Sequence, residues 1–150
     1  MERVYSIDSG ACAITAATAM CAVGLLTGAV CPVDIVEIVV GCDATTAGSL
    51  KVELCTYVTD GTGTAYTPKA QNTSARMVAA ASTAKVNYTV IPTGTLVIIR
   101  TWDFPTPTGP FDLELPLGRE ISVPVSTNIY LRFTTVTIAP NGYATLVIAE

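Results

Sequence analysis

The sequence contains no histidine among its 150 residues. Nucleophile arrangements of the Ser-His-Asp and Cys-His kinds therefore cannot be built from this chain, and mixed cysteine and histidine zinc sites are excluded as well. A dinucleotide-binding turn is also missing, because Gly61-Thr62-Gly63 lacks the third glycine and the helix that should follow it.

Paired carboxylates remain as a route to hydrolysis. Asp112 and Glu114 lie two positions apart on one side of an expected strand, a pattern typical of a solvated strand face. We therefore expect a protein that is not an enzyme and has no catalytic residue, no metal site and no cofactor.

Charged residues are scarce, at 13% of the chain against about 25% in typical domains, while hydrophobic residues make up 50%. Apolar patches left on the surface of such a chain are normally sites of association. We expect a homo-oligomer or a subunit covered by a partner. The net charge is −4, and Lys69, Arg76 and Lys85 are the nearest approach to a basic cluster. Direct binding of nucleic acid is therefore not expected.

The five cysteines show no CxxC pair and are odd in number. This count fits a closed disulfide framework poorly and favours buried thiols in a reducing compartment. Cross-strand disulfides formed after release from a cell remain an alternative.

The segment Gly10–Val33 has no charged side chain over 24 positions. Its length permits a membrane-spanning helix, but small residues fill most of it and its flanks are acidic, with Asp8 and Asp34. A secretory signal is also disfavoured, because Arg3 is its one cation and Glu2 offsets it. We interpret the segment as buried β-strands and expect no membrane contact, although membrane association through residues 10–33 remains an alternative.

Strand patterns dominate the rest of the chain. In Leu50–Val58, apolar and polar residues alternate, which is typical of a half-buried strand. In Val33–Cys42 the alternation slips once at Val36-Glu37, which predicts a bulge. The expected strands are Val4–Ile7, Cys12–Thr15, Met20–Leu26, Val33–Cys42, Leu50–Val58, Val86–Val90, Leu96–Trp102, Phe111–Leu115, Ile121–Val125, Asn128–Val136 and Gly142–Ala149.

Loops and turns are expected between these strands. Asp60–Thr64 reads as a flexible glycine loop, and Asn141-Gly142 is a strong hairpin signal. Pro68–Lys85 could form one or two helical turns or an irregular excursion, and Asp103–Pro110 holds too many prolines for a central strand. The pattern predicts one all-β domain over residues 1–150, an antiparallel β-sandwich of jelly-roll type with little helix.

An aromatic and proline-rich cluster is the strongest interface candidate. Stiff prolines lose little entropy on docking, and large aromatics are favoured interface anchors. The alternative is that the rings cover the protein's own core while the prolines shape a wide turn. The predicted interface residues are Trp102, Phe104, Pro105, Pro107 and Phe111, together with Lys69, Arg76 and Met77 of the 68–85 segment.

Three short sequence motifs carry a resemblance to a known family. They are Gly61–Pro68 (GTGTAYTP) after a charged-alternating strand, Pro116–Glu120 (PLGRE) before a strand, and the closing strand Thr145–Glu150. This arrangement resembles the capsid decoration or cement proteins of tailed bacteriophages, which are small β-sandwich virion proteins. The resemblance implies a non-enzymatic subunit, commonly trimeric, that bridges neighbouring major capsid subunits on the virion surface after assembly in the bacterial cytoplasm.

Other functions stay open from the sequence. Within the same class, a head-spike, tail or fibre subunit is possible. A carbohydrate-binding β-sandwich is an alternative from another class, because sugar platforms use exposed aromatic rings. The candidates for such a platform are Tyr57, Tyr66, Tyr88, Trp102 and Tyr143.

Overall fold

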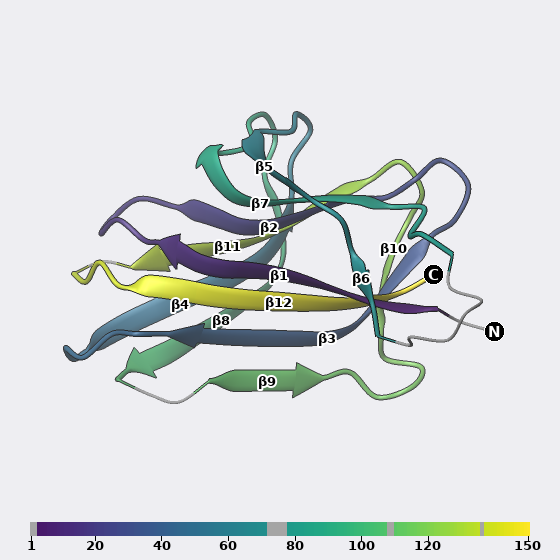
Figure 1. Cartoon of the computed structure of the whole chain (residues 1–150). Helices are drawn as coiled ribbons and strands as arrows, with labels where there is room; N and C mark the ends of the chain where they lie inside the picture. The colour runs from purple at the N-terminus through teal and green to yellow at the C-terminus, as the bar shows by residue number, and fades with distance from the viewer. Residues whose placement is uncertain (1–2, 72–77, 108–109, 136) are drawn as a thin grey trace.

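A computed structural model describes residues 3–71, 78–107, 110–135 and 137–150. Within these residues the chain is all-β, without helix, and its strands form two antiparallel six-stranded sheets packed face to face (Figure 1). The expected antiparallel β-sandwich is confirmed. The two ends of the chain lie together, because the backbones of Arg3 and Glu150 exchange hydrogen bonds of 3.1 and 3.0 Å.

The first sheet has the order β10-β3-β12-β1-β6, and β9 also pairs with β3. β9 and β10 therefore share the same edge of β3, one pairing with Glu37–Val40 and the other with Val33–Ile35. The strands of this sheet are β1 (Val4–Ala13), β3 (Val33–Cys42), β6 (Lys69–Ala70), β9 (Phe111–Glu114), β10 (Ile121–Val123) and β12 (Asn141–Ala149).

The second sheet has the order β5-β7-β2-β11-β4-β8. Strands β1 to β4 alternate between the two sheets along the chain, so their connections cross the ends of the sandwich. The strands of this sheet are β2 (Met20–Leu26), β4 (Gly48–Thr56), β5 (Thr62–Tyr66), β7 (Thr83–Val90), β8 (Val97–Thr106) and β11 (Asn128–Thr135).

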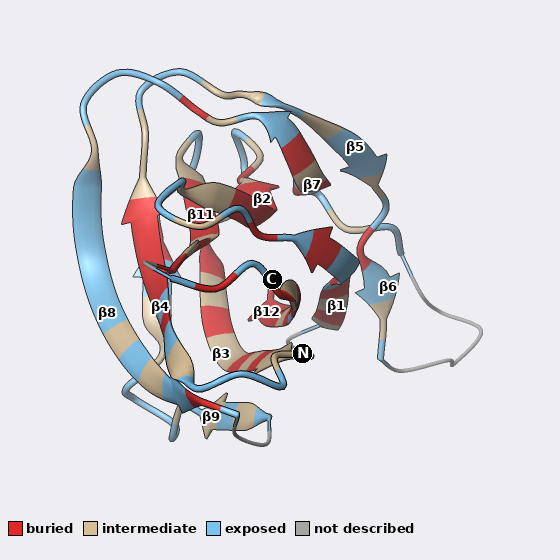
Figure 2. Ribbon diagram, turned by 90° about the vertical axis from the view of Figure 1, so that its left-hand side faces the viewer, coloured by how far each residue is buried: buried red, intermediate tan, exposed pale blue. Residues whose placement is uncertain are grey.

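The main hydrophobic core fills the space between the sheets, where Figure 2 shows the buried residues. Ile35, Ile38 and Ile148 enter it from the first sheet, and Leu54 and Leu131 enter from the second, all of them buried. Each such side chain removes apolar area from water at roughly 25 cal/mol per Å², which makes this core the main source of stability.

The uncharged segment Gly10–Val33 forms the end of β1, the whole of β2 and the start of β3. Val23 and Leu25 are fully buried between the sheets, as the strand interpretation predicts. Among the described residues, no helix has the length and apolar character needed to cross a membrane.

Other local predictions have mixed outcomes. The bulge is confirmed, because Glu37 pairs with Val147 and Ile35 with Ile148, which leaves Val36 as the extra residue. The hairpin at Asn141-Gly142 is wrong: both residues begin β12, and β11 and β12 belong to different sheets. The glycine loop is wrong at its second half, since Thr62–Tyr66 pairs with β7 as β5.

Candidate interface along strand β8

Strand β8 is the feature of this fold that most resembles a binding surface. It is ten residues long and lies at the end of the second sheet, next to β4. Figure 2 shows it at the left margin, exposed along much of its length. Val97, Ile98 and Ile99 are 54%, 46% and 42% exposed. Three consecutive apolar residues on a long edge strand are an aggregation hazard unless something covers them.

The other strands that end the sheets are short. β5 has five residues, β6 two, β9 four and β10 three. Short edge strands are one of the ways in which proteins prevent unwanted strand pairing. β6 covers only Tyr5 and Ser6 of β1, so part of β1 is also a free edge. Among the described strands, β8 differs in carrying three consecutive exposed apolar residues along its edge.

The aromatic residues of β8 face the protein's own core. Trp102 lies opposite Val52 and Phe104 opposite Leu50, and both pairs point between the sheets. Phe111 of β9 meets these rings, with centroid distances of 6.4 Å to Trp102 and 4.7 Å to Phe104. The three half-buried rings thus close one side of the sandwich, which favours the core alternative for them.

The proline-rich segment divides into two parts. Asp103–Thr106, expected to be a loop, continues β8 along β4, because an edge strand tolerates Pro105. Pro105 and Pro107 are exposed next to the aromatic rings. This part of the predicted interface therefore lies along β8, although its exposed groups are the prolines and not the rings.

The remaining predicted residues do not join this surface. Lys69 is exposed on β6, at the opposite side of the molecule from β8 (Figure 2), with its ammonium 5.7 Å from the centroid of the Tyr66 ring. Arg76 and Met77 lie outside the described residues.

The sequence contains a signal for Val97–Ile99 that the prediction missed. A half-buried strand should alternate, yet this run does not, and it leads into a proline-containing strand. Ile99 has no opposite residue on β4, since Cys55 pairs with Ile98 and Leu54 with Arg100. This bulge explains why the apolar run breaks the alternation.

A second buried cluster lies on the outer face of the second sheet. It consists of Cys21, Cys55, Tyr88 and Tyr130, each at most 1% exposed. Tyr57 and Leu96, from the connections that flank this face, pack against it. The outer face of β4 is therefore covered at Glu53 and Cys55, while Lys51 on the same face is exposed. The expectation of a half-buried strand is corrected for this second half of β4. Burial raises the pKa of the Cys21 and Cys55 thiols to about 12, so both remain protonated and inert.

Asp60 fastens the β4–β5 connection over this cluster. Its Oδ1 accepts hydrogen bonds from the Tyr88 and Tyr130 hydroxyls at 3.2 and 3.0 Å, and its Oδ2 accepts one from the Lys85 ammonium at 2.5 Å. Burial alone would raise the pKa of Asp60, but the bonds from Lys85 and Tyr130 lower it. The carboxylate is thus held charged as a structural link.

A buried ion pair completes the outer face. Arg132 donates from Nε to Glu53 at 2.5 Å and from its terminal nitrogen to the Tyr57 hydroxyl at 2.5 Å. Glu53 is only 6% exposed. Because both charges are paired and enclosed, removing either one would leave the other buried without a partner, and neither is available to a substrate.

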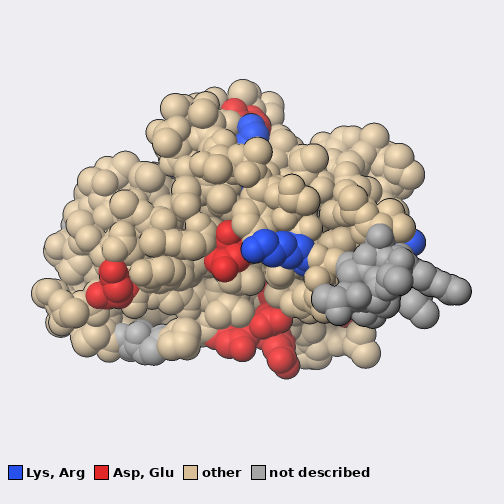
Figure 3. Space-filling model, viewed as in Figure 1, with Lys and Arg blue, Asp and Glu red and all other residues tan. Residues whose placement is uncertain are grey.

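The carboxylates considered for catalysis form a cross-strand group with Glu37. Glu114 lies directly opposite Glu37, and Asp112 opposite Val39. Burial and then the charges of Asp112 and Glu114 raise the pKa of Glu37. Figure 3 shows acidic side chains gathered where β9 lies, on a face that is otherwise largely uncharged. Among the described residues, no three cysteine or carboxylate residues are placed to hold a metal ion.

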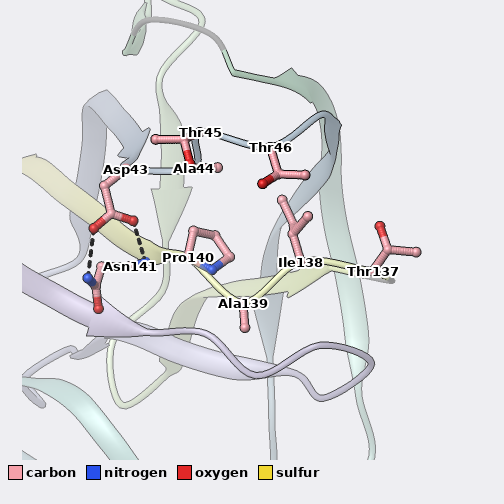
Figure 4. Close-up of a pocket in the computed structure, with 9 residues that line it drawn as sticks. All are labelled: Asp43, Ala44, Thr45, Thr46, Thr137, Ile138, Ala139, Pro140 and Asn141. Carbon is pink, nitrogen blue, oxygen red and sulfur yellow. Dashed lines mark hydrogen bonds between the residues drawn. The ribbon is translucent and has the colours of Figure 1, made fainter.

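A shallow hollow of about 460 Å³ lies at one end of the sandwich (Figure 4). Asp43 closes one side of it by accepting bonds from the backbone and side-chain nitrogens of Asn141, both at 2.7 Å. Both carboxylate oxygens are therefore engaged, and threonines 45, 46 and 137 line much of the rest. The hollow has neither a nucleophile and base pair nor an aromatic ring, so it has no evident chemistry.

No protein-family model, no curated protein and no solved structure matches the chain.

Proposed function

We propose that this protein is a non-enzymatic structural subunit of a tailed-bacteriophage virion, which decorates or cements the capsid by bridging neighbouring major capsid subunits. The observation that carries the proposal is β8, a long edge strand with three consecutive exposed apolar residues, Val97–Ile99. A protein whose surface must be completed by neighbours fits an assembly better than it fits a solitary role.

A jelly-roll topology is part of this proposal. The orders β1-β12-β3-β9 and β2-β11-β4-β8 are contained in the two sheets, and the chain alternates between the sheets from β1 to β4. A jelly roll of two Greek keys, the pattern of many viral capsid domains, has these same strand orders, which supports the proposal. β5, β6 and β7 then form an insertion between the fourth and fifth strands of the roll.

The low charge of the chain also supports a structural role. A cement protein holds a shell together by burying apolar area, at roughly 25 cal/mol per Å² less the cost of docking. Because a homo-oligomer repeats each contact, modest interfaces add up across the shell. We propose a homo-oligomer on the virion surface, assembled in the bacterial cytoplasm. The trimeric state rests on the family resemblance alone.

The experiment is sedimentation with capsid shells. Under this proposal, the genome that encodes the chain also encodes a major capsid protein. Shells assembled from that protein are mixed with the purified chain and pelleted. We expect saturable binding at a fixed number of copies per capsid subunit, with added mechanical or thermal stability of the shell. Absence of binding to shells would remove the capsid role, and binding to isolated tails or fibres would move the protein to that part of the virion.

The carbohydrate-binding alternative gains no support from the tyrosines. Tyr88 is 1% exposed, and Tyr57, Tyr66 and Trp102 are half-buried on different strands or connections. Tyr143, at 42% exposure, lies on β12 in the other sheet from these rings. A sugar platform needs neighbouring exposed rings, and these five do not form one.

A further inference from the structure

We propose that β8 is the self-association strand of this protein: a second copy adds its own β8 antiparallel to the first, about a two-fold axis perpendicular to the sheet. The inference rests on the oligomeric part of the proposed function, but it does not require the virion role. It joins the second sheets of two protomers into one continuous sheet.

A strand suits this edge better than a globular surface does. The outer edge of β8 presents backbone N–H and C=O groups that the ladder to β4 leaves free, since β8 ends the sheet. An added strand pairs these groups and covers the neighbouring side chains at the same time. Water can pair the backbone, but it leaves Val97–Ile99 exposed.

The residues of β8 are complementary to a second copy of the strand in one register, and its charges exclude two others. The strand carries two charged residues of opposite sign, Arg100 and Asp103. In a two-fold antiparallel pair, a register centred on either of them would set like charges directly opposite each other, which is destabilising. A register centred on Trp102 avoids both clashes.

The geometry of the strand selects the same centre. The bulge at Ile99 and the proline at position 105 bound a regular stretch, Arg100–Phe104, whose midpoint is Trp102. In that register Thr101 lies opposite the partner's Asp103, where its hydroxyl can donate to the carboxylate. Arg100 lies opposite the partner's Phe104, which provides a cation–π contact.

The same register covers the exposed apolar run. Beyond the regular stretch, Val97–Ile99 faces the partner's exposed Pro105 and Pro107 segment. The prolines of the predicted interface thereby acquire a role as the apolar surface that meets this run. A ladder of five residues with two apolar flanks is smaller than a standard interface of about 800 Å² per partner, so dimerisation should depend on concentration.

Sedimentation equilibrium tests the surface. The wild-type chain is compared over a wide concentration range with Ile99→Lys, in which the bulge residue is exposed and the fold is expected to persist. Val30→Lys is the matched control, because Val30 is 88% exposed in the β2–β3 connection. We expect a wild-type dimer, an unchanged Val30→Lys dimer, and a dissociation constant raised by about tenfold or more in Ile99→Lys. Circular dichroism verifies that each variant is folded.

Disulfide trapping tests the register. Opposite residues of an antiparallel pair have Cα atoms about 4.5–5.5 Å apart, within the range of a disulfide. Thr101→Cys and Asp103→Cys should therefore crosslink when the two variants are mixed, and much less when either is oxidised alone. A wild-type sample oxidised in parallel measures the background from the native thiols.

A chain that stays monomeric at every concentration would overturn the inference, as would a dimer or trimer that Ile99→Lys leaves intact. Crosslinking in a different register would overturn the centre at Trp102. A dimer that forms through β8 but does not bind capsid shells would leave this inference standing and remove the virion role.

Discussion

At the scale of single residues, the polar groups of the second sheet do structural work. Asp60 accepts bonds from Tyr88, Tyr130 and Lys85, so one carboxylate connects β7, β11 and the β4–β5 connection. Gly24 allows this cluster to form, because a Cβ there would clash with the Tyr88 hydroxyl and the Tyr130 ring. Gly24 thus leaves the space that the two tyrosines occupy, and Asp60 holds them through hydrogen bonds.

Asp60→Asn should lower the free energy of unfolding at pH 7 by about 1–2 kcal/mol, because a neutral amide accepts weaker bonds and loses the Lys85 ammonium. The pKa of Asp60 is lowered in the folded state, so its contribution is fully present above its ordinary value of 3.8 and is lost as pH falls through the folded pKa. Urea unfolding at several pH values checks this, with the exposed Asp8→Asn as control. An equal loss at pH 7 and at pH 2 would contradict the charge-based account.

Glu37→Gln should instead raise the free energy of unfolding at pH 7. The pKa of Glu37 is raised in the folded state, so the charged form destabilises the fold above that pKa, and the penalty disappears as pH falls below the ordinary value of 4.5. Removing the charge opposite Glu114 should raise stability at pH 7 by about 0.2–1 kcal/mol. Thermal unfolding at pH 7 and pH 4 measures the gain, which should shrink at the lower pH. A loss of stability at pH 7 would show that Glu37 makes a favourable contact.

At the scale of elements, the sequence predicted strands well where one face is buried and the other polar. Ile35, Ile38 and Val40 lie in the core from β3, and the slip at Val36 became the bulge, because a period of two has a direct geometric meaning. Residue types typical of turns were a poorer guide to the positions of the turns. Asn141-Gly142 is typical of a hairpin turn, yet Gly142 lies in β12. Glycine is needed at this position because a Cβ would clash with Phe133 and Ile14.

The candidate interface could be predicted only in part. The proline and aromatic content pointed to the segment that forms the end of β8, but the rings face inward, where Val52 and Leu50 lie opposite them on β4. Which strand lies at an edge depends on the order of the whole sheet. That order is set by contacts between residues far apart in the chain, and no local pattern contains it.

The inward placement of Trp102 predicts that Trp102→Ala destabilises the monomer. We expect a loss of about 2–3 kcal/mol in the free energy of unfolding, less than for a fully buried ring, because Trp102 is half-buried against the main core and Phe111. Guanidinium unfolding of the monomer at low concentration measures it. Asp103→Ala, next to it on the exposed face, is the control and should change stability by less than about 0.5 kcal/mol. Unchanged stability in Trp102→Ala would return the ring to the interface.

At the scale of the whole molecule, the second sheet is shared by two buried clusters. Val23 and Leu131 face the main core, while Cys21 and Tyr130 face the outer cluster from the same strands. The outer cluster is closed by two connections, one of them held by Asp60, and no third sheet within the described part of the chain covers it. Its stability therefore depends on a few contacts, whereas the main core depends on both sheets.

Thiol labelling should separate the two clusters. Cys12 reports the main core, Cys21 and Cys55 report the outer cluster, and Cys31 is half-buried in the β2–β3 connection. Because burial raises the pKa of Cys21 and Cys55 to about 12, neither can react until its cluster opens. We expect Cys31 to react faster than the three buried thiols, whose labelling rates should be lower by a factor of about a thousand or more.

In Asp60→Asn, labelling of Cys21 and Cys55 should accelerate more than labelling of Cys12, because the substitution loosens the outer cluster without touching the main core. Mass spectrometry of peptides after timed labelling gives each rate separately. Equal acceleration at all three buried thiols would mean that the two clusters open together. The sheet they share would then make them one cooperative unit, and Asp60 would stabilise the molecule as a whole.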